Sequence, residues 1–345
     1  MKRFSILLLA TLTTLLTACG GGEPDTVRLL THDSFLITEE TAAAFTATTG
    51  WRLEVLPAGD TGSMVNQAIL AAGNPVADVL FGVDTTFLSR ALDADLFIPY
   101  ESPVLGSLIP GLATDPDHRV TPIDYGDVCL NYDKAAFTTT PPPQSPADLT
   151  APAYRGMLVV EDPATSSPGL AFLLATIASF GEAGEYTWQD YWADLRANDV
   201  RVTSGWEEAY YGAFSGGSGE GDRPIVVSYA SSPPAEVIYA DPPVGEAPTA
   251  VVTQGCFRQV EYAGILRGTS REAGARALID FLLGERFQEE MPLTMFVFPA
   301  LASADLPAEF VAHTMIPAAP LTLDPAAIEA NRERWIEEWA AIVLR

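Results

Sequence analysis

The first hundred residues alternate between short apolar runs and helix-forming stretches, and this alternation constrains the fold more than any other feature. The apolar runs have the length of buried strands, and the predicted strands are Val27–Thr31, Trp51–Leu56 and Ala77–Val83. Helices are expected between them over residues 38–49, with Thr38 as N-cap and Gly50 as stop, and over 63–72. Buried strands that alternate with helices indicate an α/β fold with a parallel sheet built of βαβ units.

A second region repeats this pattern after residue 150. Its predicted strands are Met157–Val160, Val200–Thr203, Ile225–Tyr229 and Ala250–Thr253, and its predicted helices are Pro168–Phe180 and Trp188–Ala197. Two further strands are predicted between the regions, Asp124–Tyr132 and Arg258–Leu266, and we expect them to form a hinge. Helices are also expected over 270–283 and 325–343, the latter with Asp324 as N-cap and Pro325 in its first turn. A chain of 345 residues suits two domains. We expect one lobe from residues 27–126 plus 257–298 and another from 127–256 plus 299–345.

The N-terminus has the features of a bacterial lipoprotein export signal. Lys2-Arg3 precedes the apolar run Phe4–Leu16, and Leu16-Thr17-Ala18-Cys19 resembles a lipobox. Cleavage would remove residues 1–18 and leave Cys19 to carry the lipid, followed by a tether over 19–26. A transmembrane helix is the alternative, but the run is shorter than the ~20 residues that a bilayer core requires. The sequence therefore predicts an exported protein that is lipid-anchored to the cell membrane.

The chain is strongly acidic. It has 45 Asp and Glu residues against 19 Lys and Arg, which gives a formal net charge of −26. Such a surface repels phosphates, so a nucleic-acid partner is not expected. The charge favours approach of a cationic solute, although a solvated acidic surface is the simpler explanation and the one that we expect.

Cysteine and histidine are scarce. Beyond Cys19 the chain has only Cys129 and Cys256, neither in a CxxC motif, and it has three histidines. A zinc cluster is therefore poorly supported. Export permits a disulfide between Cys129 and Cys256, and two buried free thiols are the alternative.

Several loops could hold a ligand. The segment Asp162–Leu170 joins a strand to an apolar helix, with Ser167 as expected N-cap, and its hydroxyls and free N–H groups suit an anion or simple capping. Asp60 precedes a predicted helix in the same way, either as a cap or as a carboxylate that faces a cation. Asp84 ends a strand at a carboxyl edge, where α/β sheets bind ligands, but it is expected to cap the next helix instead. Trp206 and Tyr229 lie at loop-facing ends and could stack on a planar or cationic ring or pack in the core, and Met295–Pro299 could add another ring.

Catalytic motifs are not evident. The sequence contains no G-x-S-x-G elbow, no H-E-x-x-H and no P-loop, and the Gly216–Gly221 run lacks the lysine of a phosphate loop. A lipid-anchored hydrolase would have to draw its base from three scattered histidines, so we do not expect an enzyme.

From residue 27 onward the chain resembles the thiamine-binding solute-binding proteins of ABC importers. The resemblance rests on segments that occur in family order, namely Thr31–Phe35, Ala77–Asp84, Asp124–Gly126 with Asn131–Lys134, Asp162–Leu170, Gly205–Tyr210, Ser228–Pro233 and Trp335–Trp339. It implies a two-lobed periplasmic-binding-protein fold of type II, with the ligand in the cleft. It also implies thiamine or its phosphate esters as ligand, an ABC permease as partner, and no cofactor or metal. We expect a monomer.

The resemblance also carries residue roles. Asp60 and Ser63 match ligand-side positions of the first lobe, and Ser166, Trp206 and Tyr229 match those of the second. The chain departs from the family at three positions, where His32 and Ala235 replace Tyr and Phe296 replaces Trp. His32 and Phe296 remain candidate ligand contacts.

Alternatives within the same fold are a ferric-ion binding protein or a carrier of another small solute. An iron site needs convergent Tyr, His and carboxylate oxygens. Tyr210-Tyr211 lies in a predicted helix, which argues against such a site.

Overall fold

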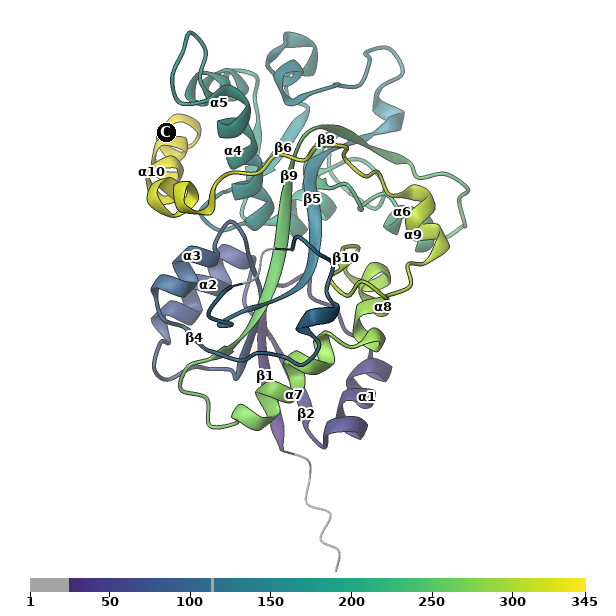
Figure 1. The fold of residues 1–345 in the computed structure, drawn as a ribbon. Helices are drawn as coiled ribbons and strands as arrows, with labels where there is room; N and C mark the ends of the chain where they lie inside the picture. The colour runs from purple at the N-terminus through teal and green to yellow at the C-terminus, as the bar shows by residue number, and fades with distance from the viewer. Residues whose placement is uncertain (1–24, 113–114) are drawn as a thin grey trace, which may run out of the picture.

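A single mixed sheet runs through the whole molecule (Figure 1). The computed structural model describes residues 25–112 and 115–345. The sheet has ten strands, eight of them in the order β2-β1-β3-β9-β5-β8-β6-β7, with β10 (Phe298–Pro299) on β5 and β4 (Phe97–Ile98) on β9. The two expected α/β regions are therefore halves of one sheet that share its central strands.

The first lobe is built on parallel strands. Here β1 (Thr26–Thr31) lies between β2 (Arg52–Pro57) and β3 (Val79–Asp84). Its helices are α1 (Glu39–Thr49), α2 (Thr61–Leu70), α3 (Leu88–Asp93), α7 (Glu272–Leu282) and α8 (Glu285–Thr294). The predicted elements are confirmed with small shifts at their ends. For example, α2 begins two residues early because the Asp60 side chain accepts the Thr61 N–H and caps it.

The second lobe repeats the arrangement. In it β6 (Leu158–Glu161) lies between β7 (Arg201–Thr203) and β8 (Ile225–Tyr229), again in parallel. Its helices are α4 (Ser167–Phe180), α5 (Trp188–Ala197), α6 (Ala235–Ile238), α9 (Ala308–His313) and α10 (Pro325–Val343). The chain ends in α10, which begins at the predicted Asp324 cap and packs against α5 (Figure 1).

Two long antiparallel strands join the lobes. They are β5 (Thr121–Asp133) and β9 (Thr249–Leu266), and both run from one lobe into the other (Figure 1). The prediction of two separate strands over 250–253 and 258–266 is wrong, because the intervening residues continue β9. The pairing shifts register there, between Val128 and Leu130 of β5, and Gly255 adopts a left-handed φ of 80° that glycine tolerates.

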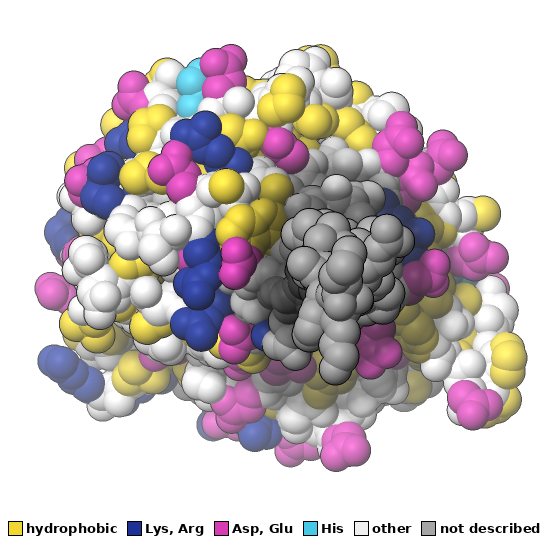
Figure 2. All heavy atoms as spheres, turned by 90° about the horizontal axis from the view of Figure 1, so that it is seen from below, with side chains coloured by type: hydrophobic (Ala, Val, Ile, Leu, Met, Phe, Trp, Pro, Cys, Tyr) yellow, Lys and Arg dark blue, Asp and Glu magenta, His cyan; other side chains and the backbone are white. Residues whose placement is uncertain are grey.

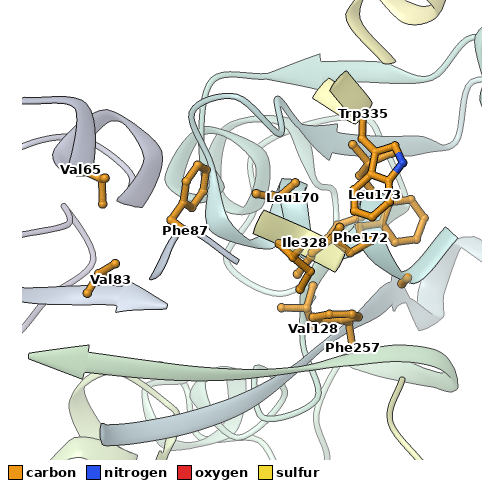
Figure 3. Packing of buried hydrophobic residues seen from close by; sticks show 14 of the residues in the cluster. Val65, Val83, Phe87, Val128, Leu170, Phe172, Leu173, Phe257, Ile328 and Trp335 are labelled. Atoms are coloured by element: carbon orange, nitrogen blue, oxygen red, sulfur yellow. The ribbon is translucent and has the colours of Figure 1, made fainter. Parts of the chain in front are cut away.

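One hydrophobic cluster extends across both lobes. Figure 3 shows Phe87 of the first lobe, Leu170 of α4 and Val128 of β5 in the same cluster as Ile328 and Trp335 of α10. The terminal helix thus contributes apolar side chains at the junction. It also contacts α3 of the first lobe.

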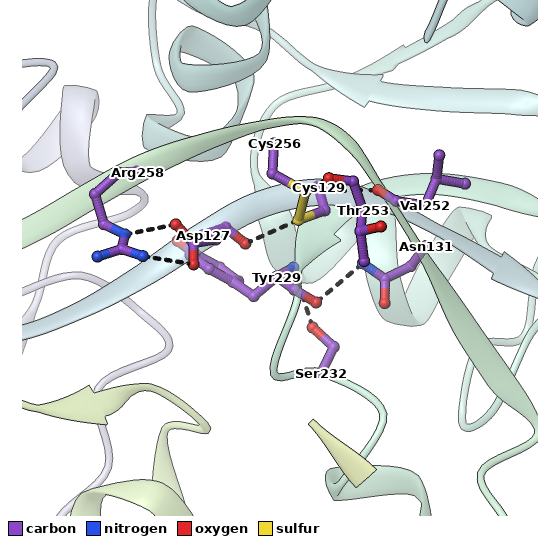
Figure 4. The surroundings of a disulfide bond; sticks show 9 residues. All are labelled: Asp127, Cys129, Asn131, Tyr229, Ser232, Val252, Thr253, Cys256 and Arg258. Atoms are coloured by element: carbon purple, nitrogen blue, oxygen red, sulfur yellow. Dashed lines mark hydrogen bonds and ion pairs between the residues drawn. A yellow bond between two sulfur atoms is a disulfide. The ribbon is translucent and has the colours of Figure 1, made fainter. Parts of the chain in front are cut away.

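A disulfide ties the two joining strands together. Cys129 of β5 and Cys256 of β9 are bonded, with their Cα atoms 4.4 Å apart (Figure 4). Two residues away on each strand, Arg258 Nη2 lies 3.0 Å from Asp127 Oδ2, and the Asp127 side chain is buried. The junction is therefore held by a covalent bond and an ion pair as well as by strand pairing.

The predicted signal peptide over 1–18, the predicted lipidation site Cys19 and the predicted tether as far as residue 24 lie outside the described residues. Across the described ranges, no helix combines the length and the apolar character needed to cross a membrane. On the face drawn in Figure 2, acidic and basic side chains are interspersed.

Candidate functional site

A cavity of about 390 Å³ lies between the lobes. The first lobe lines it with the loops around residues 32–34 and 59–63, and the second lobe with those around 165–168 and 204–211. Of the predicted ligand residues, the cavity brings together His32, Asp60, Ser63, Trp206, Tyr229 and Phe296.

Ser166 does not line the cavity. Its side chain is fully buried, and its Oγ accepts the Gly169 N–H at 3.4 Å as the N-cap of α4. The prediction that Ser167 caps this helix is therefore wrong by one residue. Ser167 instead faces the cavity, and its Oγ accepts a hydrogen bond from Gln259 Nε2 at 3.2 Å. Of this pair, Ser167 and not Ser166 is therefore the residue that lines the cavity.

Asp60 connects the two lobes. Its carboxylate caps α2 through the Thr61 N–H at 2.6 Å. The same carboxylate accepts the backbone N–H of Trp206 at 3.0 Å and that of Ser167 at 3.4 Å, both in the second lobe. Beside it, the N–H groups of Gly62 and Ser63 donate to the Thr165 carbonyl at 2.9 and 3.3 Å. Asp60 therefore caps α2, as one of its two expected roles requires, and it also lines the cavity.

Aromatic side chains form one wall of the cavity. The Trp206 ring stacks on Tyr210 at a centroid distance of 5.0 Å, and its indole N–H donates to Ser228 Oγ at 2.9 Å. Tyr211 meets Trp206 edge-on at 5.5 Å. Tyr229 donates to Gln259 Oε1 at 3.3 Å. Because these rings are fixed by hydrogen bonds and stacking, they form a preorganised apolar surface.

The sequence reasoning missed Tyr210 and Tyr211 as cavity residues. The helix that carries them is wound as a π-helix over Glu208–Ala213, a geometry that occurs frequently at functional sites. The spacing of Trp206 and Tyr210 by four residues was the available signal, since residues i and i+4 share one helix face.

Buried acids and a histidine lie at the floor of the cavity. Glu261 of β9 lines it, and His32 Nε2 lies 3.7 Å from Glu261 Oε2. Burial alone would lower the pKa of His32, but Glu261, with smaller contributions from Asp60 and Asp33, raises it above 6.5. The sequence signal for Glu261 was an acid between Val260 and Tyr262, in the part of β9 over 259–266 that is buried.

Asp84 and Asp124 lie next to Glu261 on the neighbouring strands. Burial, with Glu261 adding to it, raises the pKa of Asp84 to about 7. Burial, Glu261 and Asp84 hold the pKa of Asp124 well above its ordinary value. Asp84 accepts a hydrogen bond from Thr86 Oγ1 at 2.8 Å, and the prediction that it caps the next helix is wrong because α3 begins at Leu88 without a side-chain cap.

The cavity is acidic and contains no Lys or Arg among the lining residues that the structure describes. Its carboxylates are Asp33, Asp60, Glu207, Glu208 and Glu261. Within the described part of the chain, no group of three or more His, Cys, Asp or Glu residues is arranged to hold a metal ion. Carboxylates beside stacked aromatic rings suit an organic cation.

The sequence and the fold define a class of protein. The bacterial extracellular solute-binding protein family matches residues 74–329, most of the chain, and the chain belongs to this family. It is therefore a binding protein for transport that works outside the cytoplasm, and it is not an enzyme.

Individual relatives are similar over nearly the whole length. The thiamine-binding periplasmic protein of Escherichia coli K12 is 30% identical over 302 residues, which cover 88% of this chain and 87% of that protein. A solved structure of a periplasmic thiamin binding protein superimposes with a TM-score of 0.82 at 28% identity, covering 93% of this chain and 96% of the other. Iron uptake protein A1 of Synechocystis is 24% identical over 294 residues, covering 83% of this chain and 78% of that protein. The fold is accordingly the type II periplasmic-binding-protein fold that the sequence predicted.

Proposed function

We propose that the protein captures thiamine, with or without phosphate, and delivers it to an ABC permease in the membrane. The observation that carries the proposal is the cavity, in which an aromatic wall built on Trp206 faces carboxylates without a neighbouring Lys or Arg in its described lining. Thiamine combines a flat aminopyrimidine with a cationic thiazolium ring, so it matches both features. The E. coli relative and the solved thiamin binding protein support the same ligand.

The proposed ligand contacts follow from the lining. Trp206, Tyr229 and Phe296 would contact the rings, while Asp60, Ser63 and His32 would supply the polar and charged groups. Ser167 takes the place first given to Ser166. The lobes that close on the ligand are those divided at residues 27–126 plus 257–298 and 127–256 plus 299–345.

The proposal includes the membrane anchor. The lipobox Leu16–Cys19 supports cleavage after Ala18 and lipid attachment at Cys19, which would keep a monomeric binding protein close to its permease. Two acyl chains on one cysteine anchor far more stably than one.

Thiamine is expected to stabilise the folded protein. A ligand that binds only the native state adds about 2.7 kcal/mol to the free energy of unfolding at 100 times its Kd. Thermal melts with and without saturating thiamine, thiamine phosphate and thiamine diphosphate measure this gain. Melting curves that none of the three ligands shifts would show that the cavity serves another solute.

A ferric ion is less suited to this cavity than an organic cation. Ferric sites in which tyrosine is a ligand bind the tyrosinate, and burial opposes ionisation here. Burial, with Glu236 close by, holds the pKa of Tyr210 well above 10, and burial raises that of Tyr211 to about 12. The Tyr210 hydroxyl also donates to Glu236 at 2.8 Å, so its proton is already engaged.

Trp206→Ala is expected to weaken thiamine binding by about 1–3 kcal/mol, because it removes both contact area and attraction between the ring and the thiazolium charge. Trp206→Phe keeps an aromatic ring, so its affinity for thiamine should lie between those of the wild-type protein and the alanine variant. Calorimetric titration of the three proteins gives the order. If the alanine variant binds as tightly as wild type, the aromatic wall does not hold the ligand.

A further inference from the structure

Three carboxyl groups stand side by side beneath the cavity, on three neighbouring strands of the sheet. Glu261 of β9 pairs in register with Asp84 of β3 on one side and with Asp124 of β5 on the other. Residues directly opposite each other on antiparallel strands project from the same face, with Cβ atoms about 4.5–5.5 Å apart. Asp84 and Asp124 are fully buried, and Glu261 is 7% exposed. Three carboxyls this close cannot all carry a charge where water is excluded.

Asp124 shows the need for a proton most directly. Across the part of the chain that the structure describes, neither of its carboxyl oxygens accepts a hydrogen bond from a donor group. The Glu261 carboxyl lies within hydrogen-bonding reach of it and adds to the effect of burial in raising its pKa. A buried carboxylate without a partner is costly, so we expect the two carboxyls to share a proton. Of this row of three, Glu261 is the member that lines the cavity.

His32 is the basic group next to this row. Its Nε2 lies 3.7 Å from Glu261 Oε2, and its ring packs so closely on Gly82 that a side chain there would overlap it. The other charged groups that face His32 are Asp33 and Asp60. No Lys or Arg is present among the described residues of the lining. The imidazole is therefore held among acids, which favour its protonated form.

Two further neighbours of Glu261 stay neutral. Tyr229 of β8 faces it, and burial, followed by the charge of Glu261, holds the tyrosine pKa well above 10. Gln259 Nε2 donates to Glu261 Oε1 at 3.4 Å and carries no charge. A change of charge beside a ligand must therefore come from His32 or from the carboxyl row.

We infer that the protein captures its organic cation in exchange for a proton, which the ligand's positive charge displaces from the pair formed by His32 and Glu261. The inference rests on the proposed function, since it takes thiamine as the cation. Before capture, the imidazolium of His32 balances the charge of Glu261. The thiazolium charge repels the imidazolium, so His32 loses one proton to the solvent and the ligand becomes the partner of Glu261. One positive charge enters and one leaves, so the net charge of the site is unchanged.

Calorimetric titration of the wild-type protein with thiamine at pH 6, 7 and 8 tests this exchange. Release of one proton lowers the Kd by up to about tenfold for each unit of rising pH, until the free protein has lost that proton. Titrations in HEPES and in Tris count the protons, because each released proton adds the ionisation enthalpy of the buffer to the heat. His32→Asn should bring the count close to zero. His118→Asn makes the same change at a histidine 4.0 Å from Glu101, outside the cavity, and should leave the count unchanged.

A second measurement covers the case in which His32→Asn fails to fold. The chain has three histidines, so their imidazole signals can be followed singly by NMR, with those of His118 and His313 assigned from their own asparagine variants. The remaining signal, that of His32, should titrate at a lower pH once thiamine is bound. Thiamine binding without a released proton and without this shift overturns the inference and leaves the proposed function intact. If thiamine does not bind at any pH, the proposed function fails and the proton exchange fails with it.

Discussion

Replacing Cys129 and Cys256 together by alanine is expected to lower the free energy of unfolding by about 5 kcal/mol. The bond joins residues 127 positions apart, and the entropy lost by the unfolded chain on closing so long a loop corresponds to roughly this value. Both side chains are buried, at 2% and 1% exposure, so alanine avoids leaving a polar group without a partner.

Urea unfolding of the wild-type and double-variant proteins under non-reducing conditions measures the difference. The wild-type protein with the disulfide reduced should unfold at the same urea concentration as the variant, within the small effect of the lost side-chain atoms. Labelling of the denatured, unreduced mature protein should modify neither Cys129 nor Cys256. Equal stability of wild type and variant, or two labelled thiols, would contradict the expectation.

The position of the bond suggests how the two lobes are coupled. It ties β5 to β9 at the point where their register shifts, and the Asp127–Arg258 ion pair follows two residues along each strand. Tyr229, which pairs with Val128 of β5, lines the cavity directly beside this junction (Figure 4). The covalent tie therefore fixes β5, the strand with which β8 and its Tyr229 pair.

Most of the fold could be predicted from local sequence patterns. The helix Trp188–Ala197 and the strand Ile225–Tyr229 were predicted to the residue, because caps and apolar runs are local signals. The continuity of β9 was not predicted, since Gln254 and Gly255 interrupt the apolar pattern and only the pairing with β5 holds that segment in the sheet. Similarly, Ser166 and Ser167 are both capable caps, and the choice between them depends on tertiary contacts.

The candidate site was predicted in its residues more than in its interactions. The loops that bear His32, Asp60 and Trp206 could be found from their polar or aromatic composition at strand ends. The hydrogen bond that Asp60 accepts from the N–H group of a residue 146 positions away could not be predicted, because no local pattern encodes the approach of two lobes. For the same reason, the grouping of Asp84, Asp124 and Glu261 from three strands beneath the cavity could be recognised only once those strands were adjacent.

Those acids make stability depend on pH. Asp84 is fully buried, and its pKa is raised from 3.8 to about 7, chiefly by burial and further by Glu261. A carboxyl with a raised pKa in the folded state keeps its proton there after the unfolded chain has lost it. The contribution of Asp84 to the free energy of unfolding is therefore fully present below about pH 4. It is lost as the pH rises from about 4 to about 7.

Asp84→Asn is expected to remove this loss, since the amide stays neutral at every pH. The shift from 3.8 to about 7 corresponds to about 4 kcal/mol, so the variant should gain up to that much over wild type between pH 4 and pH 8. Urea unfolding at pH 4.5, 6 and 8 measures the difference. The exposed Asp305→Asn substitution serves as the control and should give a curve parallel to wild type. If the Asp84→Asn and wild-type curves also run parallel, the buried carboxyl titrates as it does in water, and the strands beneath the cavity do not hold it in its neutral form.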